Sequence, residues 1–453
     1  MSIQIAGSSM FGLGLQTGLG TVQSTNGNFY YYPFTGLAHG PQQPVVALPP
    51  ESGRDITPRS FYKQGLWCAG AVNLLPRLDH DFGWILHAGL GANTLLEDTY
   101  FKDTPVVVTG TDIAFVAADK HITDVSAGLG VFAVGDRITV TGSDHNDGEH
   151  IVTTAAAGVL DCAGSTFVEE EAGATVTLTC YMTGATAGAG SHVHQFRYAA
   201  AQDALPYLTT RRMLHNSDTP ASSLGEVGQD NHIGTMEFSL PATGPLSASL
   251  EMVGRIPTWV ADPITTWATA GVTYDDDDTF ALGIDEYSML QINGATLKAT
   301  GCVVSLVNNL MSADQTRIYG SPYPVDFPVL SRGGSVRMTA LCETYGLYQS
   351  LFTGAETLGG TYTANPLRGN FRLRGYSPKT FAKTSGTANY VIEFLNGLYG
   401  TEDNVVWSLQ GAIQLAPQQP IILSLIGQLE RNPGGSLLTV NLQNDFTTTY
   451  ALA

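Results

Sequence analysis

The sequence feature that most constrains the fold is an alternation of apolar and polar residues, VGDRITVTGSDHNDGEHIVTT, between Val134 and Thr154. A period of two is typical of a β-strand with one buried face, and Asn146-Asp147-Gly148 in the middle is typical of a tight turn. The run therefore predicts a β-hairpin. Several neighbouring stretches are also rich in Val, Ile and Thr, so we expect a chain made mainly of β-strands.

Composition agrees with a β-rich chain and limits its function. Of 453 residues, 43% are hydrophobic, 13% are charged and 51 are glycine, which suits many short strands joined by turns. The net charge of −19 opposes binding of nucleic acid through the surface as a whole, because phosphates would be repelled. The same charge suits a protein that lets DNA pass without holding it.

The spacing of the cysteines and the N-terminal residues indicate the compartment in which such a chain is made. The five cysteines, Cys68, Cys162, Cys180, Cys302 and Cys342, form no close pair, which argues against a disulfide scaffold or a zinc site. We expect five reduced thiols. The first residues lack the basic and apolar regions of a signal peptide, and no window reaches the ~18 apolar residues of a membrane helix. Synthesis in the cytoplasm and no membrane contact are expected.

Helical periodicity is confined to two stretches, PRLDHDFGWILHAGLG from Pro76 and CETYGLYQSLFTGAE from Cys342. In the first, Leu78, Phe82 and Ile85 fall on one helical face. Each stretch follows a strand-like run, GLWCAGAVNLL or GGSVRMTAL. The predicted order is therefore strand and then helix in both places.

A second pair of similar stretches indicates a duplication. LPATGPLSASL begins at Leu240 and LAPQQPIILSL at Leu415, and both have a proline five residues after the leucine and end in Ser-Leu. In the first half, more residues separate the helix from this stretch than in the second half. The difference is roughly the length of residues 105–190. The simplest account is two copies of one β-rich domain with a module inserted into the first copy. Chance similarity between β-strand sequences is the alternative.

This account divides the chain into three parts. Residues 1–104 together with 191–256 would form a first, discontinuous domain. Residues 105–190 would form the inserted β-rich module, and residues 257–453 the second domain.

No motif predicts catalysis. His192 and His194 form an H-x-H pair on an expected strand, but the sequence places no third metal ligand. The acidic run YDDDDTF, from Tyr274 to Phe280, lacks the spacing of a calcium loop, and GLGLQTGLG is not closed by the Lys-Ser or Lys-Thr of a phosphate loop. We expect no catalytic residue, no metal and no cofactor. A β-rich hydrolase is kept as an alternative to this non-enzymatic interpretation.

Some of these stretches resemble a known family. FAVGDRITVTGSDHNDGEHIVTT together with AGATVTLT resembles the small β-rich module common in tail proteins of long-tailed bacteriophages. The flanking segments LPYLTTRRML, IGTMEFSLPATGPLSASLEMVG and NGATLKATGCVVSLVNNL are similar, in that order, to segments of the siphophage tail tube (major tail protein) family. The first sixty and last fifty residues match less well.

The resemblance implies a mainly-β fold of tandem duplicated tail-tube β-sandwich or barrel domains, each with one flanking helix, and an outward-facing inserted module. It implies virion rings that stack around a channel for genome ejection into the host. Three two-copy chains would close a ring with approximate sixfold symmetry, and six single-copy chains are the alternative. Other implied partners are tail proteins such as the tape measure and tail-end proteins, while double-stranded DNA passes without specific binding.

Stacked rings need protruding loops or hairpins, and two aromatic, turn-rich stretches are candidates: GNFYYYPFTGLAHGPQQP and MSADQTRIYGSPYPVDFP. The predicted inter-ring contacts in them are Tyr30, Tyr31, Tyr32, Phe34, Tyr319, Tyr323 and Phe327. The alternative function is that of an adhesin or tail-fibre protein with the inserted module as receptor binder.

Overall fold

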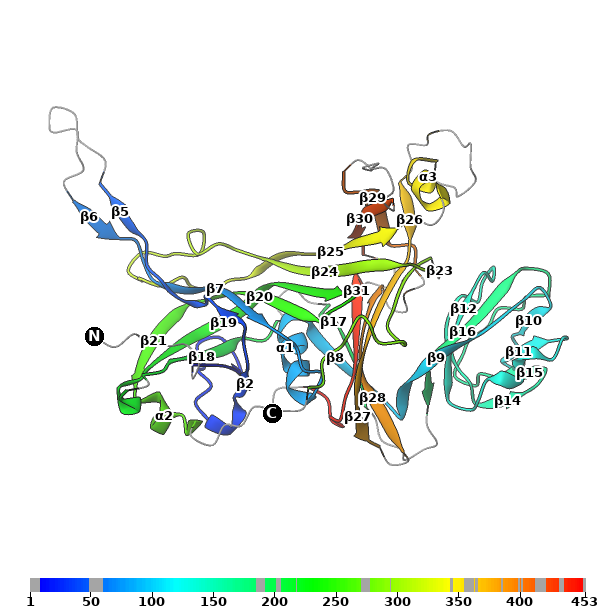
Figure 1. Cartoon of the computed structure of the whole chain (residues 1–453), viewed down its shortest axis with the longest axis horizontal. Coiled ribbons are helices and arrows are strands. Elements are labelled where there is room, and N and C mark those ends of the chain that lie inside the picture. The colour runs from blue at the N-terminus through cyan, green and yellow to red at the C-terminus, as the bar shows by residue number, and fades with distance from the viewer. Residues whose placement is uncertain are drawn as a thin grey trace.

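The computed structural model describes residues 9–48, 60–184, 192–200, 205–216, 218–269, 278–293, 295–342, 345–353, 362, 366–383, 386–397, 400, 402–411, 421–431 and 436–450. This part of the chain consists mainly of antiparallel strands (Figure 1), which confirms the predicted mainly-β fold class. Two large sheets pack together in the body of the molecule. Two smaller sheets lie at one end of it, and a separate hairpin projects at the other end.

The larger sheet has fourteen strands within the described residues. They are β1 (Met10–Leu15), β2 (Tyr30–Tyr32), β3 (Gly36–Leu37), β4 (Gly40–Gln42), β7 (Trp67–Leu74), β18 (Leu208–Leu214), β19 (Leu224–Pro241), β20 (Ser247–Gly254), β21 (Ile256–Ala261), β24 (Ala299–Leu310), β25 (Val329–Leu341), β26 (Leu367–Gly369), β29 (Val405–Leu409) and β30 (Ile422–Leu429). The long strand β19 pairs with β18, β20, β21 and β24. It therefore joins the strands of the first half to those of the second half.

The chain passes through this sheet in the same order twice. The neighbouring strands are β3 and β4, then β7, β20 and β19, and the sheet continues directly with β24, β25, β30 and β29. Every neighbouring pair is antiparallel, so corresponding strands of the two sets run in the same direction. The second set therefore repeats the first by displacement along the sheet.

The sequence similarity noted above falls at matching positions of the two sets. Leu250 of β20 lies opposite Val72 of β7, and Leu425 of β30 lies opposite Met338 of β25. All four side chains are buried in the main core. Ser249-Leu250 thus pairs with β7, the strand before the first predicted helix. Ser424-Leu425 pairs at the matching place with β25, the strand before the second predicted helix.

The second large sheet has seven strands in the described part and also draws on both halves. They are β8 (Gly91–Leu96), β17 (Val193–Tyr198), β22 (Met289–Ile292), β23 (Ala295–Thr296), β27 (Phe371–Ala382), β28 (Thr387–Asn396) and β31 (Leu438–Gln443). β31, the last of these strands in the sequence, lies between β17 and β28. The two predicted domains therefore share both large sheets, and β21, just beyond the expected boundary at residue 256, pairs with β19 of the first half.

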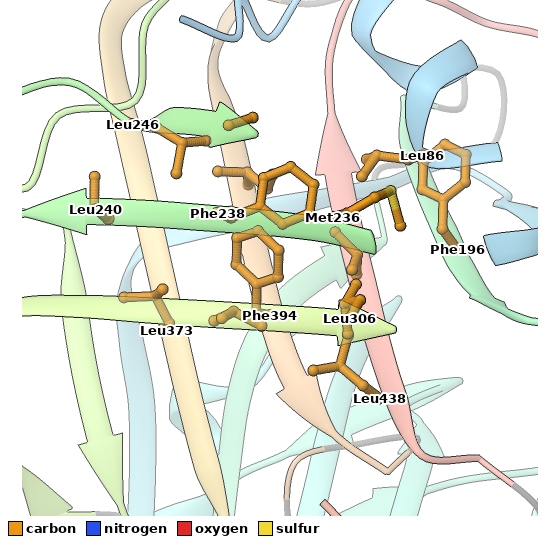
Figure 2. Packing of buried hydrophobic residues seen from close by; sticks show 14 of the residues in the cluster. Leu86, Phe196, Met236, Phe238, Leu240, Leu246, Leu306, Leu373, Phe394 and Leu438 are labelled. Atoms are coloured by element: carbon orange, nitrogen blue, oxygen red, sulfur yellow. The ribbon is translucent and has the colours of Figure 1, made fainter. Parts of the chain in front are cut away.

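The main core lies between the two large sheets. Phe238 of β19 faces Phe394 of β28 with their ring centroids 5.2 Å apart, and Phe82 meets Phe238 edge-on at 6.1 Å. Figure 2 shows leucine, methionine and phenylalanine side chains from both sheets filling this space. Each large apolar side chain buried in this way contributes about 1.5–3 kcal/mol. One continuous core therefore holds the two halves together.

Both predicted helices are present, as α1 (His80–Leu90) and α3 (Tyr345–Thr353). The Asp79 carboxylate caps the first turn of α1, and Gly91 ends the helix with a φ of 85°, a conformation that favours glycine. α1 packs between β19 and the strands β8 and β17, and α3 packs beside β26 and β29. Further short helices, which the periodicity does not predict, are α2 (Pro263–Thr266) and 3-10 turns at Asn26–Asn28, Gly128–Val131 and Pro220–Ser222.

The predicted insertion forms two four-stranded sheets with a core of their own, on the right of Figure 1. One sheet contains β9 (Thr99–Gly110), β12 (Asp136–Thr141), β13 (Gly148–Ile151) and β16 (Val176–Gly184), and the other contains β10 (Ile113–Val116), β11 (His121–Asp124), β14 (Thr154–Ala156) and β15 (Val159–Asp161). Phe115, Ile138 and Leu178 are among the side chains buried between them. Residues 105–184 are called the inserted module below.

The hairpin predicted between Val134 and Thr154 is present, with one difference. β12 pairs with β13 across the turn at Asn146–Gly148. Beyond Ile151 the chain leaves this sheet, and β14 pairs with β15 in the other sheet of the module. Val152, where the change occurs, is buried in the module core. One alternating run of sequence thus supplies strands to two sheets.

A buried ion-pair cluster lies beneath the root of the inserted module. The Glu393 carboxylate of β28 is fully buried and accepts hydrogen bonds from Arg372 at 2.7 Å, from Arg374 at 2.6 and 2.9 Å, and from Asn441 at 3.1 Å. Burial alone would raise the pKa of Glu393, but Arg372 and Arg374 outweigh that effect and lower it. The carboxylate therefore stays charged in the interior.

The same two arginines hold the strands that connect the module to the body. The Arg372 guanidinium lies 3.5 Å from the ring centre of Tyr181 in β16, and the Arg374 guanidinium lies 4.7 Å from the ring centre of Phe101 in β9. Such cation–π contacts are strongest where water is excluded. The two connecting strands are therefore fixed on the body.

Candidate assembly surface

A two-stranded hairpin projects from the body at the end opposite the inserted module (Figure 1). It consists of β5 (Val45–Ala47) and β6 (Phe61–Lys63), which pair with Val46 opposite Tyr62. In the described part of the chain neither strand pairs with any other. Residues 45–48 and 60–63 are called the arm below.

The arm carries exposed apolar side chains. Val45, Phe61 and Tyr62 are 59%, 67% and 49% exposed, and Leu48 is 48% exposed. A two-stranded hairpin alone is at best marginally stable in water, and clustered exposed apolar groups mark a contact surface. The arm is therefore the first candidate surface for self-association.

A long loop from the second half packs against the base of the arm. In this loop, residues 311–328, Arg317 donates a hydrogen bond to the carbonyl oxygen of Gln64 and lies 5.0 Å from the ring centre of Trp67. Tyr319 of the loop is fully exposed. The arm and this loop thus place apolar and aromatic groups from both halves at one end of the molecule.

Four of the seven predicted inter-ring residues precede the arm and pack mainly within the chain itself. Tyr30 stacks on Trp84 of α1 at 4.9 Å, and Tyr31 and Phe34 are partly buried. Tyr32 is buried and donates a hydrogen bond of 2.9 Å to a backbone carbonyl of α1. The structure corrects the prediction for Tyr32, because a buried side chain offers no surface to another ring.

The other three predicted residues lie in the loop at the base of the arm. Tyr319 is fully exposed and Tyr323 partly exposed, so both can contact another chain. Phe327 is fully buried, and its prediction is corrected for the same reason as that of Tyr32. The sequence prediction missed the arm itself, although Phe61 and Tyr62 expose more apolar surface than most of the predicted residues.

The H-x-H pair contacts the C-terminal segment. His192 Nδ1 lies 2.9 Å from the carbonyl oxygen of Asn444, and His194 Nε2 lies 3.0 Å from that of Phe446. Burial lowers the pKa of both histidines, that of His194 to about 4. Both are therefore neutral at pH 7 and hold residues 444–446 by hydrogen bonds. Among the described residues, no three His, Cys, Asp or Glu side chains are grouped as metal ligands.

All five cysteines are free thiols, and Cys342 is the one that is only partly buried. Within the described ranges, no helix has the length and apolar character needed to span a membrane. The expected acidic loop lies largely outside the described residues, which resume at Asp278.

Comparison with known proteins gives no family for this chain: no family model matches it, and no curated protein sequence matches it. Its function is therefore argued from its own fold and surfaces.

Proposed function

We propose that this chain is a structural subunit of a bacteriophage tail tube, assembling in the virion into stacked rings around a channel for DNA. The repeated strand order of the larger sheet carries the proposal. In a ring, each copy lies beside the next in the same orientation. The two strand sets are related in the same manner, because the second set lies beside the first in one sheet with its strands in the same directions. Three such chains would form a ring with approximate sixfold symmetry. A ring of six chains is the alternative.

The ends of the larger sheet support ring closure. The row of strands that contains both sets ends at the short strands β3 and β4 on one side and at β29 with the three-residue strand β26 on the other. Edge strands present unpaired N–H and C=O groups that favour pairing with another chain. Inside the chain, the first strand set meets the second through β19 and β24. The corresponding junction between chains would join the edge formed by β26 and the end of β29 in one chain to β3 and β4 of the next.

The arm and the loop at its base supply the contact between rings. Phe61 and Tyr62 of the arm and Tyr319 of the loop are exposed. The arm projects at the end of the molecule opposite the inserted module (Figure 1). Docking against another ring would bury this apolar surface, at about 25 cal/mol per Å². The module, with its own core, would then decorate the tube without forming its wall.

The charge of the chain supports DNA passage. Asp and Glu number 40 against 21 Lys and Arg, for a net charge of −19. A channel built from such chains repels phosphate groups, which prevents DNA from binding to the wall.

Electron microscopy of the purified protein tests the proposal. We expect open-centred rings or tubes, with three chains per ring and a sixfold appearance at low resolution. Compact monomers at high protein concentration would reject the tube function. Oligomers without a central opening would favour the adhesin or tail-fibre alternative.

The arm can be tested separately with Phe61→Ser combined with Tyr62→Ser. Both side chains are exposed in the single chain, so the free energy of unfolding should change by no more than about 0.5 kcal/mol. Rings should still form, but stacking into tubes should be lost, as measured by tube length in micrographs. Val131→Ser removes an exposed apolar side chain from the inserted module and should leave tubes unchanged. Normal tubes from the double variant would show that the arm makes no inter-ring contact.

A further inference from the structure

A wide cleft separates the inserted module from the body. Its volume is about 550 Å³, within the range of sites that hold small organic ligands. One wall is the outer face of β9, β12 and β16 in the module. The other wall is formed by β22, β27 and the residues beside them, with Gly400 and Asp403 of the body.

The module wall is a surface of threonine hydroxyl groups. Thr139 lies directly opposite Thr179, and Thr141 lies directly opposite Thr177, on the paired strands β12 and β16. The alternate residues of these strands face the module core. Thr139 is buried and Thr179 is partly exposed, and both line the cleft. Their hydroxyl groups have no protein partner in the described part of the chain, so each can bond to a ligand in the cleft.

The body wall carries amides and a carboxylate. Gln291, Asn293 and Asn370 line it, together with Asp403. The Asn293 side-chain oxygen is occupied, because it accepts a hydrogen bond of 2.9 Å from the Asn370 backbone N–H. The side chains of Asn370 and Asp403 have no protein partner among the described residues. The two walls thus face each other with hydroxyl, amide and carboxylate groups.

The base of the cleft is rigid. Tyr181 donates a hydrogen bond of 3.1 Å to the Gln291 side-chain oxygen, and the Arg372 guanidinium covers its ring at 3.5 Å. Arg372 is itself held by the buried Glu393. Because both walls are anchored at this point, a ligand would enter a cleft that is already formed, which lowers the entropic cost of binding.

The chemistry of the cleft selects one class of ligand. The walls combine many hydrogen-bonding groups with apolar surface of similar extent, including Pro105 and Val107, which suits the hydroxyl groups and C–H faces of a sugar. Asp147 and Asp403 at the cleft carry two negative charges, which outnumber the one positive charge that remains when Arg372 and Arg374 share the Glu393 carboxylate. Anionic ligands are therefore disfavoured. We infer that this cleft binds a neutral oligosaccharide of about three sugar units, independently of whether the chain forms a tube.

Saturation-transfer NMR on the full-length protein tests the inference. The probes are neutral trisaccharides (maltotriose, cellotriose, chitotriose and globotriose) and sialyllactose, which has similar size but bears a carboxylate. At least one neutral trisaccharide should bind, and sialyllactose should bind at least about tenfold more weakly than that probe.

A pair of threonine variants locates the site. Thr139→Val combined with Thr179→Val keeps the shape of the wall but removes two free hydroxyl groups, and should weaken binding at least about tenfold. Thr154→Val, an exposed strand position in the other sheet of the module, should leave binding unchanged. The inference is overturned if none of the neutral probes binds, if sialyllactose binds as tightly as they do, or if the double variant binds like the unmodified protein. Thermal unfolding of each variant would confirm that the module remains folded.

Discussion

The charge of Glu393 stabilises the buried ion-pair cluster of the interior. It pairs with two arginines, of which Arg374 is fully buried. Glu393→Gln would leave both cations without a counterion, and breaking a buried pair in this way costs about 3–5 kcal/mol. Because its folded pKa is lowered, the stabilisation by Glu393 is present above its unfolded pKa and is lost as the pH falls through the folded value.

Urea unfolding at pH 7 measures this effect. Glu430→Gln provides the control, since Glu430 pairs with Arg368 on the surface with both side chains about half exposed. An exposed pair of this kind contributes about 0–1 kcal/mol. Equal losses of unfolding free energy in the two variants would show that burial does not increase the contribution of Glu393 to stability.

A second residue-scale prediction concerns acid stability. Burial lowers the pKa of His87 in α1 from 6.5 to about 4. Below pH 6.5 the unfolded chain therefore binds a proton that the folded chain does not, and stability falls as the pH decreases toward 4. His87→Leu removes this proton uptake, so the loss of stability between pH 7 and pH 5 should be smaller by about 2 kcal/mol.

The melting temperature across pH 7 to 4 checks this prediction. His145→Leu, at an exposed position of the inserted module, is the matched control and should keep the pH profile of the unmodified protein. A profile for His87→Leu that parallels the unmodified one would mean that other groups cause the acid sensitivity.

At the scale of elements, local periodicity explains what the sequence could predict. The helices α1 and α3 and the β12–β13 hairpin each have a complete pattern within one stretch of chain. The arm has no such pattern, because each of its strands is three residues long. Burial of Tyr32 and Phe327 depends on packing with distant segments, which residue type alone does not reveal. The sequence therefore predicts the loop of the candidate assembly surface but not its arm.

The inserted module can be removed as an element. Val106 of β9 lies opposite Cys180 of β16, so the chain ends left by deleting residues 106–180 are close together. Joining them with a short Gly/Ser linker keeps Phe101 and Tyr181, which pack on the arginines of the body. We expect this variant to fold and to assemble as the full-length chain does.

Circular dichroism and electron microscopy would measure folding and assembly of the deletion variant. A matched deletion that also removes residues 99–105 and 181–184 takes away the root strands and should destabilise the body. If the shorter deletion also prevents assembly, the module is part of the tube wall.

At the scale of the whole molecule, the described residues contain two large cores and two much smaller apolar clusters. The main core includes side chains from both halves, whereas the core of the inserted module is separate. The sequence similarity indicated a duplication but could not show that the halves share sheets, because strand pairing between distant segments leaves no local pattern. We therefore expect two thermal transitions, one for the body and one for the module, and not the three that independent domains would give.

Calorimetry with one core variant in each part tests this count. Phe238→Ala, in the main core, should reduce the unfolding free energy of the body by the 3–5 kcal/mol typical of such a cavity. Only the melting temperature of the body should fall. Ile138→Ala, in the module core, should reduce the unfolding free energy of the inserted module by about 2–5 kcal/mol. Only the melting temperature of the module should fall. Separate transitions for the two halves of the body would contradict the shared core.

The position of β31 links folding to the completion of synthesis. β31 fills the place between β17 and β28, yet it leaves the ribosome after every other described strand. Chains grow from the N-terminus, so an interrupted translation product has the arm and both helices but lacks the strand that unites the second sheet. Such a fragment cannot complete the body. Only a finished polypeptide would be competent to assemble, and defective copies would be kept out of a structure in which one faulty subunit could obstruct all the others.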